Sequence, residues 1–378
     1  MKTIYLDHAA ATPTDPSVLQ DMQPYFSEHF HNPSATYQAA REVRHALETA
    51  RSRVAHWLGA RPAEIVFTAG GTEGNNLAIH GIVRSFPNSN VVVSSVEHES
   101  VLEPAREYDC REAAVFPDGR VDLDDLRNKI DRNTVLVSVM YANNEIGTVQ
   151  PIREIAKIID EKRAERGARD APLLFHTDAC QAANYLDLHV ARLGVDLMTV
   201  NGSKIYGPKQ SGVLYVKGGV RIQPFIRGGG QERGLRSGTE NVAAAVGLAT
   251  ALELVQSDRR EETRRLQSLQ QLFLQEIIEK FPRLTINGSQ RFRLPNNVHL
   301  TFPGHDNERL LIRLDEAGIL AAAGSACAAD SGEPSHVLKA MGISDSDARA
   351  SLRFTMGRGT TESMVGQTVR TVTQFLLP

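Results

Sequence analysis

The hydrophobic pattern of the first two thirds of the chain predicts a series of buried strands. Short apolar runs bounded by turn-forming residues occupy 64–70, 90–98, 134–145, 172–180, 195–204 and 211–219. Segments with helical spacing of apolar residues separate several of these runs, most clearly 34–59 and 148–167. Strands that alternate with helices favour an α/β fold with a mostly parallel sheet, and ligands of such sheets lie beyond the carboxyl ends of the strands.

The pattern changes in the last third of the chain. A long helical stretch covers 240–281, and shorter strand and helix patterns follow it up to residue 378. We expect the long stretch to be a helix that bridges into a smaller α+β domain. The predicted boundary lies near residue 250, so that 15–250 form the large domain and 1–14 together with 251–378 form the small one.

Composition and charge exclude several classes of protein. The chain has 42 Lys and Arg against 45 Asp and Glu, and its formal net charge of -3 gives no long-range attraction for nucleic acid or an anionic membrane. No apolar stretch approaches the roughly 20 residues that span a bilayer, and the first residues lack the apolar core of a signal peptide. We therefore expect a cytoplasmic protein with neither membrane binding nor strong nucleic-acid binding.

A glycine turn joins a predicted strand to a predicted helix. Gly70, Gly71 and Thr72 follow the run that starts at residue 64 and precede an apolar helical segment. Free backbone N–H groups at a helix N-terminus, with the positive end of the helix dipole, form a site for an anion. A tight turn with Thr72 as the helix N-cap explains the same residues, and the motif is neither a Walker A loop nor GxGxxG.

Asp178 ends one predicted strand, and Lys204 follows the next one. Such a pair commonly forms a simple ion pair. A pyridoxal phosphate enzyme, however, needs a Lys amine for the Schiff base, a carboxylate for the pyridine nitrogen and an anion cradle for the phosphate. Asp178, Lys204 and the turn at 70–72 supply all three, so their joint occurrence favours this cofactor.

Motifs that run nearly from end to end of the chain carry a family resemblance. They include YLDHAAATP at 5–13, GGTEGNNLAI at 70–79, HTDACQ at 176–181, SKIYGPK at 203–209, GSAC at 324–327 and RFTMGR at 353–358. On these motifs the chain resembles a NifS/IscS-type cysteine desulfurase, a class V pyridoxal phosphate enzyme. The resemblance implies a fold-type I PLP-transferase, whose large sheet domain is covered by helices and whose small C-terminal domain is α+β.

The resemblance also implies roles around the cofactor ring. Lys204 carries the Schiff base, Asp178 pairs with the pyridine nitrogen, His98 stacks on the ring face, and Gln181 reaches the phenolic oxygen. Taken alone, His98 is better explained as a structural histidine than as a catalytic one. A stacked His98 can also move protons, because the ordinary pKa of histidine lies near neutral pH.

The phosphate contacts implied by the family are Gly71, Thr72 and Ser203, with Thr239 contributed across a homodimer interface. The chain departs from many relatives here, because they have His where Ser203 stands and Ser where Asn201 stands. The individual phosphate contacts therefore stay open, whereas the role of the lysine does not depend on them.

Arg353, Asn144 and Cys327 are assigned to the substrate. A guanidinium fork suits the carboxylate of L-cysteine, although an ion pair within the fold is the alternative for Arg353. Asn144 approaches the same carboxylate or the ring substituents, with an Asx turn as its alternative. Cys327 lies among small residues and receives the substrate sulfur as a persulfide. A lone Cys is otherwise a small buried hydrophobe.

The three cysteines, Cys110, Cys180 and Cys327, are scattered and include no CxxC pair, so the sequence predicts neither a disulfide framework nor a thiolate zinc site. We expect Cys110 to lie in a charged loop and Cys180 to be a small buried residue. How the Cys327 thiol loses its proton stays open, because either the site lowers the thiol pKa or His98 accepts the proton.

The sequence thus predicts conversion of L-cysteine to L-alanine, with sulfur passed through Cys327 to an acceptor protein. The acceptor could serve iron-sulfur cluster assembly or the thiolation of tRNA or of DNA as phosphorothioate. The alternatives are a selenocysteine lyase or another class V lyase or aminotransferase. A different kind of function, a docking scaffold that activates a thiolation partner, is disfavoured by the intact set of chemical residues.

Overall fold

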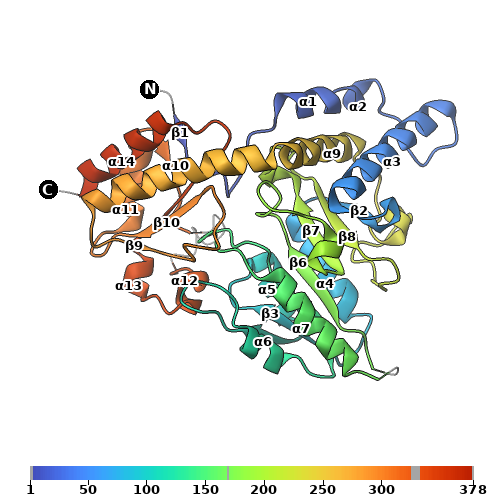
Figure 1. Cartoon of the computed structure of the whole chain (residues 1–378). Helices are drawn as coiled ribbons and strands as arrows, with labels where there is room; N and C mark the ends of the chain where they lie inside the picture. The colour runs from blue at the N-terminus through green and yellow to red at the C-terminus, as the bar shows by residue number, and fades with distance from the viewer. Residues whose placement is uncertain (1–2, 168–169, 325–332, 377–378) are drawn as a thin grey trace.

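A seven-stranded sheet forms the centre of the protein (Figure 1). The computed structural model describes residues 3–167, 170–324 and 333–376. The strand order is β2-β8-β7-β6-β5-β3-β4, and the contacts from β7 through β4 are all parallel. Strands β8 and β2 are antiparallel to their neighbours. The bounds are β2 (Ile65–Thr68), β3 (Asn90–Ser94), β4 (Asp109–Ala113), β5 (Thr134–Ser138), β6 (Leu174–Asp178), β7 (Leu197–Asn201) and β8 (Gly212–Val216). The mostly parallel sheet predicted from the sequence is therefore confirmed.

The six apolar runs predicted as strands are six of the seven strands, and β4 is the one that the pattern missed. Strand β4 has a charged sequence and lies at the edge of the sheet, where β3 is its one neighbour among the strands of the described residues. An edge strand needs an apolar side chain only where it faces the core, so charge along it does not prevent pairing. The expectation that Cys110 lies in a loop is wrong, because Cys110 is paired with Val91 in this strand.

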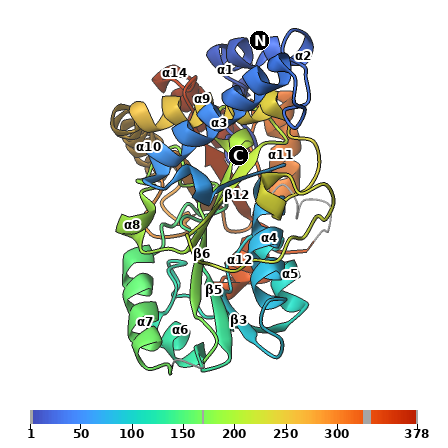
Figure 2. The ribbon, with the colours of Figure 1, turned by 90° about the vertical axis from the view of Figure 1, so that its right-hand side faces the viewer.

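Helices cover both faces of the sheet (Figure 2). Helices α4 (Gly71–Val83) and α5 (Glu99–Arg106) cover one face, and α6 (Leu123–Lys129), α7 (Ile152–Ala164) and α8 (Val190–Leu193) cover the other. Successive side chains of a strand point to opposite faces of the sheet, so each strand contributes to the hydrophobic cluster on either face. Val91 and Val93 belong to the cluster with α4 and α5, whereas Val92 belongs to the cluster with α7. Their nearly continuous apolar sequences follow from burial on both sides.

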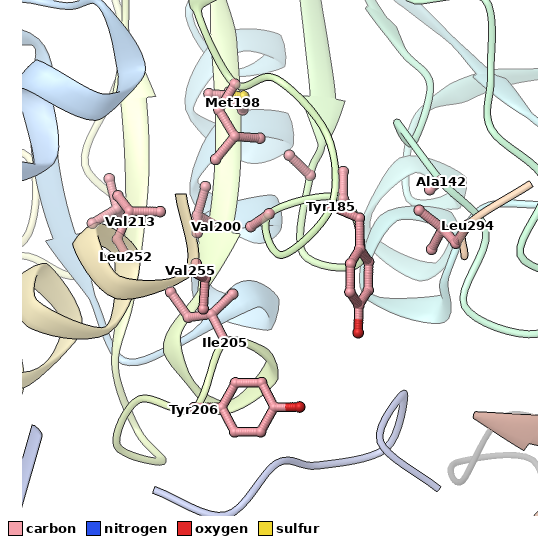
Figure 3. Close-up of a cluster of buried hydrophobic side chains, with 14 of the residues drawn as sticks. Ala142, Tyr185, Met198, Val200, Ile205, Tyr206, Val213, Leu252, Val255 and Leu294 are labelled. Atoms are coloured by element: carbon pink, nitrogen blue, oxygen red, sulfur yellow. The ribbon is translucent and has the colours of Figure 1, made fainter. Parts of the chain in front are cut away.

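A second helical layer carries the chain past the end of the sheet. Helix α9 (Val242–Ser257) packs against α3 (Gln38–Leu58) and α1 (Pro16–Met22), with the short α2 (Pro24–Ser27) beside them. Leu252 and Val255 of α9 lie in one buried cluster with Val200 and Val213 of the sheet (Figure 3). Helix α10 (Arg259–Lys280) follows after Asp258, so the predicted bridging helix is two helices that meet at this residue.

The C-terminal part has its own antiparallel sheet of order β12-β10-β9. Its strands are β9 (Thr285–Ile286), β10 (Asn297–Thr301) and β12 (Ser351–Thr355), and its helices are α11 (Asn307–Glu316), α12 (His336–Ala340), α13 (Asp345–Ala348) and α14 (Glu362–Leu376). Near the start of the chain, β1 (Ile4–Tyr5) pairs in parallel with β11 (Ile319–Leu320). Strand β1 therefore lies within the C-terminal part of the molecule (Figure 1). Within the described ranges, none of the helices has the length and apolar character that crossing a membrane requires.

Candidate active site

A cavity of about 210 Å³ lies at the carboxyl ends of the parallel strands. Residues that end or follow β3, β5, β6 and β7 line it, as do the N-terminus of α4, residues of the segment after β1, and Arg353 of β12. This is the sheet edge at which the sequence predicted a ligand. The cavity therefore brings together segments from both sheets.

The N-terminus of α4 borders this cavity and a larger one of about 630 Å³. Gly70, the N-cap, has φ +141° and no side chain that could cap the helix, whose first hydrogen bond is from Gly74 N to Gly70 O. A Cβ at Gly71 would lie 2.9 Å from Cys180 Sγ, so only glycine fits without a shift. The first turn therefore offers backbone N–H groups at a point that an anion can reach.

Asp178, the last residue of β6, is a buried carboxylate with two donors of its own. Cys180 N donates to Oδ1 at 2.8 Å, and Asn75 Nδ2 donates to Oδ2 at 2.7 Å. Hydrogen bonds of this kind orient a carboxylate and offset part of the cost of burying it. The Asp178 side chain is thus fixed where it lines the cavity.

Glu97 is a second, deeper carboxyl group close enough to interact electrostatically with Asp178. Its side chain is fully buried and accepts hydrogen bonds from Ser94 Oγ and from Met140 N, the latter at 2.8 Å. Burial, together with the charge of Asp178 and against the two donors, raises the Glu97 pKa to about 8. Glu97 is therefore mostly protonated at pH 7, which avoids two adjacent negative charges.

Lys204 ends a short 3-10 turn (Gly202–Lys204) that directly follows β7. Its Nζ donates to Ala9 O at 3.0 Å and to Ala10 O, and Gln181 Nε2 also donates to Ala9 O, at 2.9 Å. The segment that follows β1 thus runs directly past the lysine. Ala9 and Ala10 line the cavity together with Lys204, and their carbonyl oxygens fix the position of the Lys204 amine there.

His98 is the N-cap of α5 and lines the same cavity. Its Nδ1 accepts a hydrogen bond from Ser100 N at 3.0 Å and lies 2.9 Å from Ser100 Oγ. An N-cap side chain that binds the N–H two residues ahead is the usual way of closing a first turn. The cap holds the imidazole in a fixed orientation at the cavity wall.

Arg353 is nearly completely buried on β12, with 1% of its side chain exposed. Its Nη2 donates to Asp7 Oδ1 at 2.6 Å, and its Nη1 donates to Asn144 O at 2.9 Å. The Nε group is buried and has no partner within the described ranges. The guanidinium is therefore held rigidly against the cavity, with donor capacity left for an anionic ligand.

Most of the predicted site residues meet at this cavity. Those lining it are Gly71, Thr72, His98, Asn144, Asp178, Gln181, Lys204 and Arg353. Ser203 lines the adjoining larger cavity, which shares Gly71, Thr72 and Asn201 with the first. Thr239 lines a different cavity of about 230 Å³, beside Arg236. Cys327 lies outside the described residues, and its role stays a prediction.

Several residues of the site received no role in binding or catalysis from the sequence. Asp7 and Asn75 stand inside quoted motifs, so the motifs were a signal without an assigned role. Asn201 Oδ1 accepts from Ser203 N at 3.1 Å and from Ser203 Oγ at 3.0 Å, which orders the turn before Lys204. Cys180 lines the cavity as a buried thiol, and burial, with the nearby Asp178, raises its pKa well above the ordinary value. Burial therefore favours the protonated thiol, which is the less nucleophilic form.

Comparison with known proteins identifies the family. The model of the aminotransferase class-V family matches residues 4–366. The chain is 40% identical over 375 residues to a protein of Dictyoglomus turgidum named cysteine desulfurase IscS, covering 97% of this chain and 93% of that protein. The chain belongs to the cysteine desulfurases of this family.

Two solved structures resemble this desulfurase fold. One, a NifS-like protein, has a TM-score of 0.91 and 31% identity, and covers 99% of each chain. The other, SspA in complex with cysteine, has a TM-score of 0.81 and 35% identity over 94% of this chain and 99% of that one.

Cysteine desulfurases of class V are pyridoxal phosphate enzymes, and the cavity fits this cofactor. The uncapped first turn of α4 and the space left by Gly71 suit the phosphate. The buried Asp178 carboxylate suits a protonated pyridine nitrogen, and the Lys204 amine lies in the same cavity. The donor and acceptor chemistry of the cavity is thus complementary to the three polar parts of the cofactor.

Proposed function

We propose that the protein is a pyridoxal phosphate-dependent cysteine desulfurase that converts L-cysteine to L-alanine and transfers the sulfur to Cys327. The observation that carries this proposal is the meeting of Lys204, Asp178, His98 and Arg353 at one cavity. The lysine and carboxylate suit the cofactor, and the guanidinium suits the substrate carboxylate. A scaffold without catalysis has no need for this combination.

Each residue of the cavity has its own role in binding or proton transfer. Lys204 would hold the cofactor through its aldehyde, and its amine would move the proton from the substrate Cα. Asp178 would hold the pyridine nitrogen in its protonated form, and His98 would contact the ring. When bound, the cofactor supplies an electron-withdrawing ring that accepts the electron pair released at Cα. Arg353 binds the substrate carboxylate, with the carbonyl of Asn144 and the carboxylate of Asp7 holding the guanidinium in place.

Sulfur transfer balances without an external oxidant. The Cys327 thiolate attacks the substrate sulfur, the C–S bond of the substrate breaks, and the electron pair stays on the carbon that becomes the methyl group of alanine. The products are alanine and a persulfide on Cys327, so one substrate thiol and one enzyme thiol are consumed for each transfer. An acceptor protein then takes the outer sulfur, for iron-sulfur cluster assembly or for nucleic-acid thiolation.

The proposal has a direct test. The purified full-length protein is loaded with pyridoxal phosphate and given L-cysteine, and alanine and sulfide are measured with and without a thiol reductant. We expect alanine in both cases and catalytic turnover with the reductant. Lys204→Ala should lose borohydride-trappable cofactor and alanine formation together, whereas Lys209→Ala, in the same motif, should retain both. Alanine formation by Lys204→Ala at the wild-type rate would overturn the assignment.

We further propose a cytoplasmic homodimer in which Thr239 of each chain reaches the phosphate of the partner. The position of Thr239 at a cavity separate from Lys204 supports a contribution to another chain. We propose the division into 15–250 and 1–14 with 251–378, which is supported by the separate sheets on either side of α9 and α10. Analytical ultracentrifugation tests the dimer.

A further inference from the structure

We propose that Asn75 and Ser100 are positioning residues that link His98 to Asp178 and set the protonation pattern of the His98 ring. In this arrangement His98 is a hydrogen-bond donor through Nε2 and not a base for the Cys327 thiol. The proposal deepens the proposed function and rests on it, because His98 and Asp178 act there on the same cofactor.

Asn75 is the centre of the link. Its side chain is fully buried on α4, and Nδ2 donates both to Asp178 Oδ2 at 2.7 Å and to Ser100 Oγ at 2.9 Å. A carboxylate oxygen can only accept a hydrogen bond, so the carboxamide must direct Nδ2, and not Oδ1, toward Asp178. In this orientation the Oδ1 atom is buried without a hydrogen-bond partner among the described residues, which costs folding free energy.

Ser100 carries the link to His98. Its hydroxyl oxygen accepts from Asn75, so its own hydrogen is available for His98 Nδ1 at 2.9 Å. The backbone N–H of Ser100 also donates to Nδ1, at 3.0 Å. A backbone N–H cannot accept, so Nδ1 must present a lone pair, and the single hydrogen of a neutral imidazole then lies on Nε2.

This pattern limits what His98 can do at the cavity. Nε2 already carries hydrogen, and Nδ1 faces two donors, so the ring offers no free lone pair to the proton of a thiol. A hydrogen bond from Nε2 to an electron-rich atom remains available. The proton of the Cys327 thiol must therefore go elsewhere than to His98. The same chain of donors gives Asp178 one of its two hydrogen bonds.

Nitrogen NMR of the full-length chain labelled with ¹⁵N-histidine tests the protonation pattern without relying on activity. The His98 signals are assigned by their loss in His98→Gln. We expect, near neutral pH and before and after cofactor loading, an unprotonated Nδ1 and a protonated Nε2. A protonated Nδ1 overturns the proposal.

The role of Asn75 is tested by Asn75→Leu, which keeps the approximate shape and removes the donor. We expect a change in the His98 Nδ1 resonance and an increase of about tenfold in the cofactor dissociation constant, as for loss of one hydrogen bond to a charged group. Asn90→Leu is the matched control. Asn90 is also buried, donates a hydrogen bond to an aspartate, Asp131, at 3.0 Å, and has an Oδ1 atom without a partner among the described residues. It is the first residue of β3, whereas the cavity lies beyond the last residue of that strand.

Equal effects of the two leucine variants on His98 and on cofactor binding would refute the positioning role. If Asn75→Leu does not fold, Ser100→Ala removes only the hydroxyl; there we expect a shifted Nδ1 resonance with the hydrogen still on Nε2. An unshifted resonance counts against the link. Failure of the proposed function can be told apart from failure of this proposal. In the first case wild-type protein forms no alanine from cysteine, whereas the NMR measurement of the His98 nitrogens does not depend on activity.

Discussion

Arg353, which lines the cavity, forms an ion pair with Asp7, 346 positions earlier in the chain. The guanidinium is nearly inaccessible, whereas the Asp7 side chain is 19% exposed. The pair ties the segment after β1 to β12 and holds the guanidinium in place at the cavity. It therefore acts on stability and on substrate binding together.

Asp7→Asn should reveal both effects. Because Arg353 would keep a buried charge without its partner, we expect the free energy of unfolding to fall by about 3 kcal/mol. We also expect the KM for cysteine to rise more than kcat falls, since the guanidinium loses one of its two supports. Urea denaturation and steady-state kinetics measure these changes.

Asp15→Asn provides the comparison, because Asp15 pairs with Arg358 at 3.0 Å where both side chains are partly exposed. We expect a loss of less than about 1 kcal/mol and an unchanged KM there. Similar behaviour of the two variants would show that the Asp7 pair has no special role.

Glu97→Gln should change how stability depends on pH. The folded-state pKa of Glu97 is about 8, above the ordinary value near 4.3, so between these values the folded protein binds a proton that the unfolded chain has lost. The stabilisation from this proton is complete below about pH 4 and disappears as pH rises toward 8. Wild-type protein should thus lose on the order of 1 kcal/mol per pH unit relative to Glu97→Gln over this window.

Urea denaturation at a series of pH values between 5 and 8 measures the difference. Glu103→Gln on the surface of α5, where the side chain is 68% exposed, should give a pH profile parallel to wild type. A parallel profile for Glu97→Gln as well would contradict the protonated state of Glu97.

Gly71→Ala should weaken cofactor binding through the phosphate turn. The new Cβ would lie 2.9 Å from Cys180 Sγ and 3.4 Å from Asn201 Nδ2, so the turn or the thiol must shift. We expect a loss of about 1–3 kcal/mol in stability, typical of overpacking, and weaker uptake of pyridoxal phosphate measured by its absorbance. Adding Cys180→Ala should recover part of the stability, whereas Gly359→Ala, with nothing within 4 Å of its Cβ, should change neither quantity.

Cys327→Ser should separate cofactor chemistry from sulfur transfer. We expect normal cofactor binding but no mass increase of one sulfur atom on the protein after cysteine is added, because serine cannot form a persulfide. Cys110→Ser on β4 should retain the modification, since burial raises the pKa of that thiol to about 11 and keeps it protonated. A persulfide on the Cys327→Ser protein would remove Cys327 from the pathway.

The sequence predicted those parts of the site that follow from local pattern. Asp178 and Lys204 stand at the ends of apolar runs, and a parallel sheet brings such ends to one edge. The glycine turn was recognisable because a strand and a helix flank it. The family motifs then added His98, Gln181 and Arg353, which no periodicity identifies.

What the sequence did not reveal depends on contacts between distant segments. The partner of Arg353 is Asp7, and nothing in the spacing of the chain indicates that pair. Asn75 was detectable in principle as a polar residue on the apolar face of a helix, but its partners belong to β6 and α5. Strand β4 escaped because an edge strand tolerates charge.

The pairing of β1 with β11 makes the pocket around the lysine depend on the C-terminal part of the molecule. The carbonyl oxygens that orient the lysine amine follow β1, and backbone hydrogen bonds to β11 and β12, far later in the chain, hold this segment. Contacts between such distant positions must overcome the entropy of closing a long loop. We therefore expect the lysine to gain its final surroundings only once the C-terminal strands have folded.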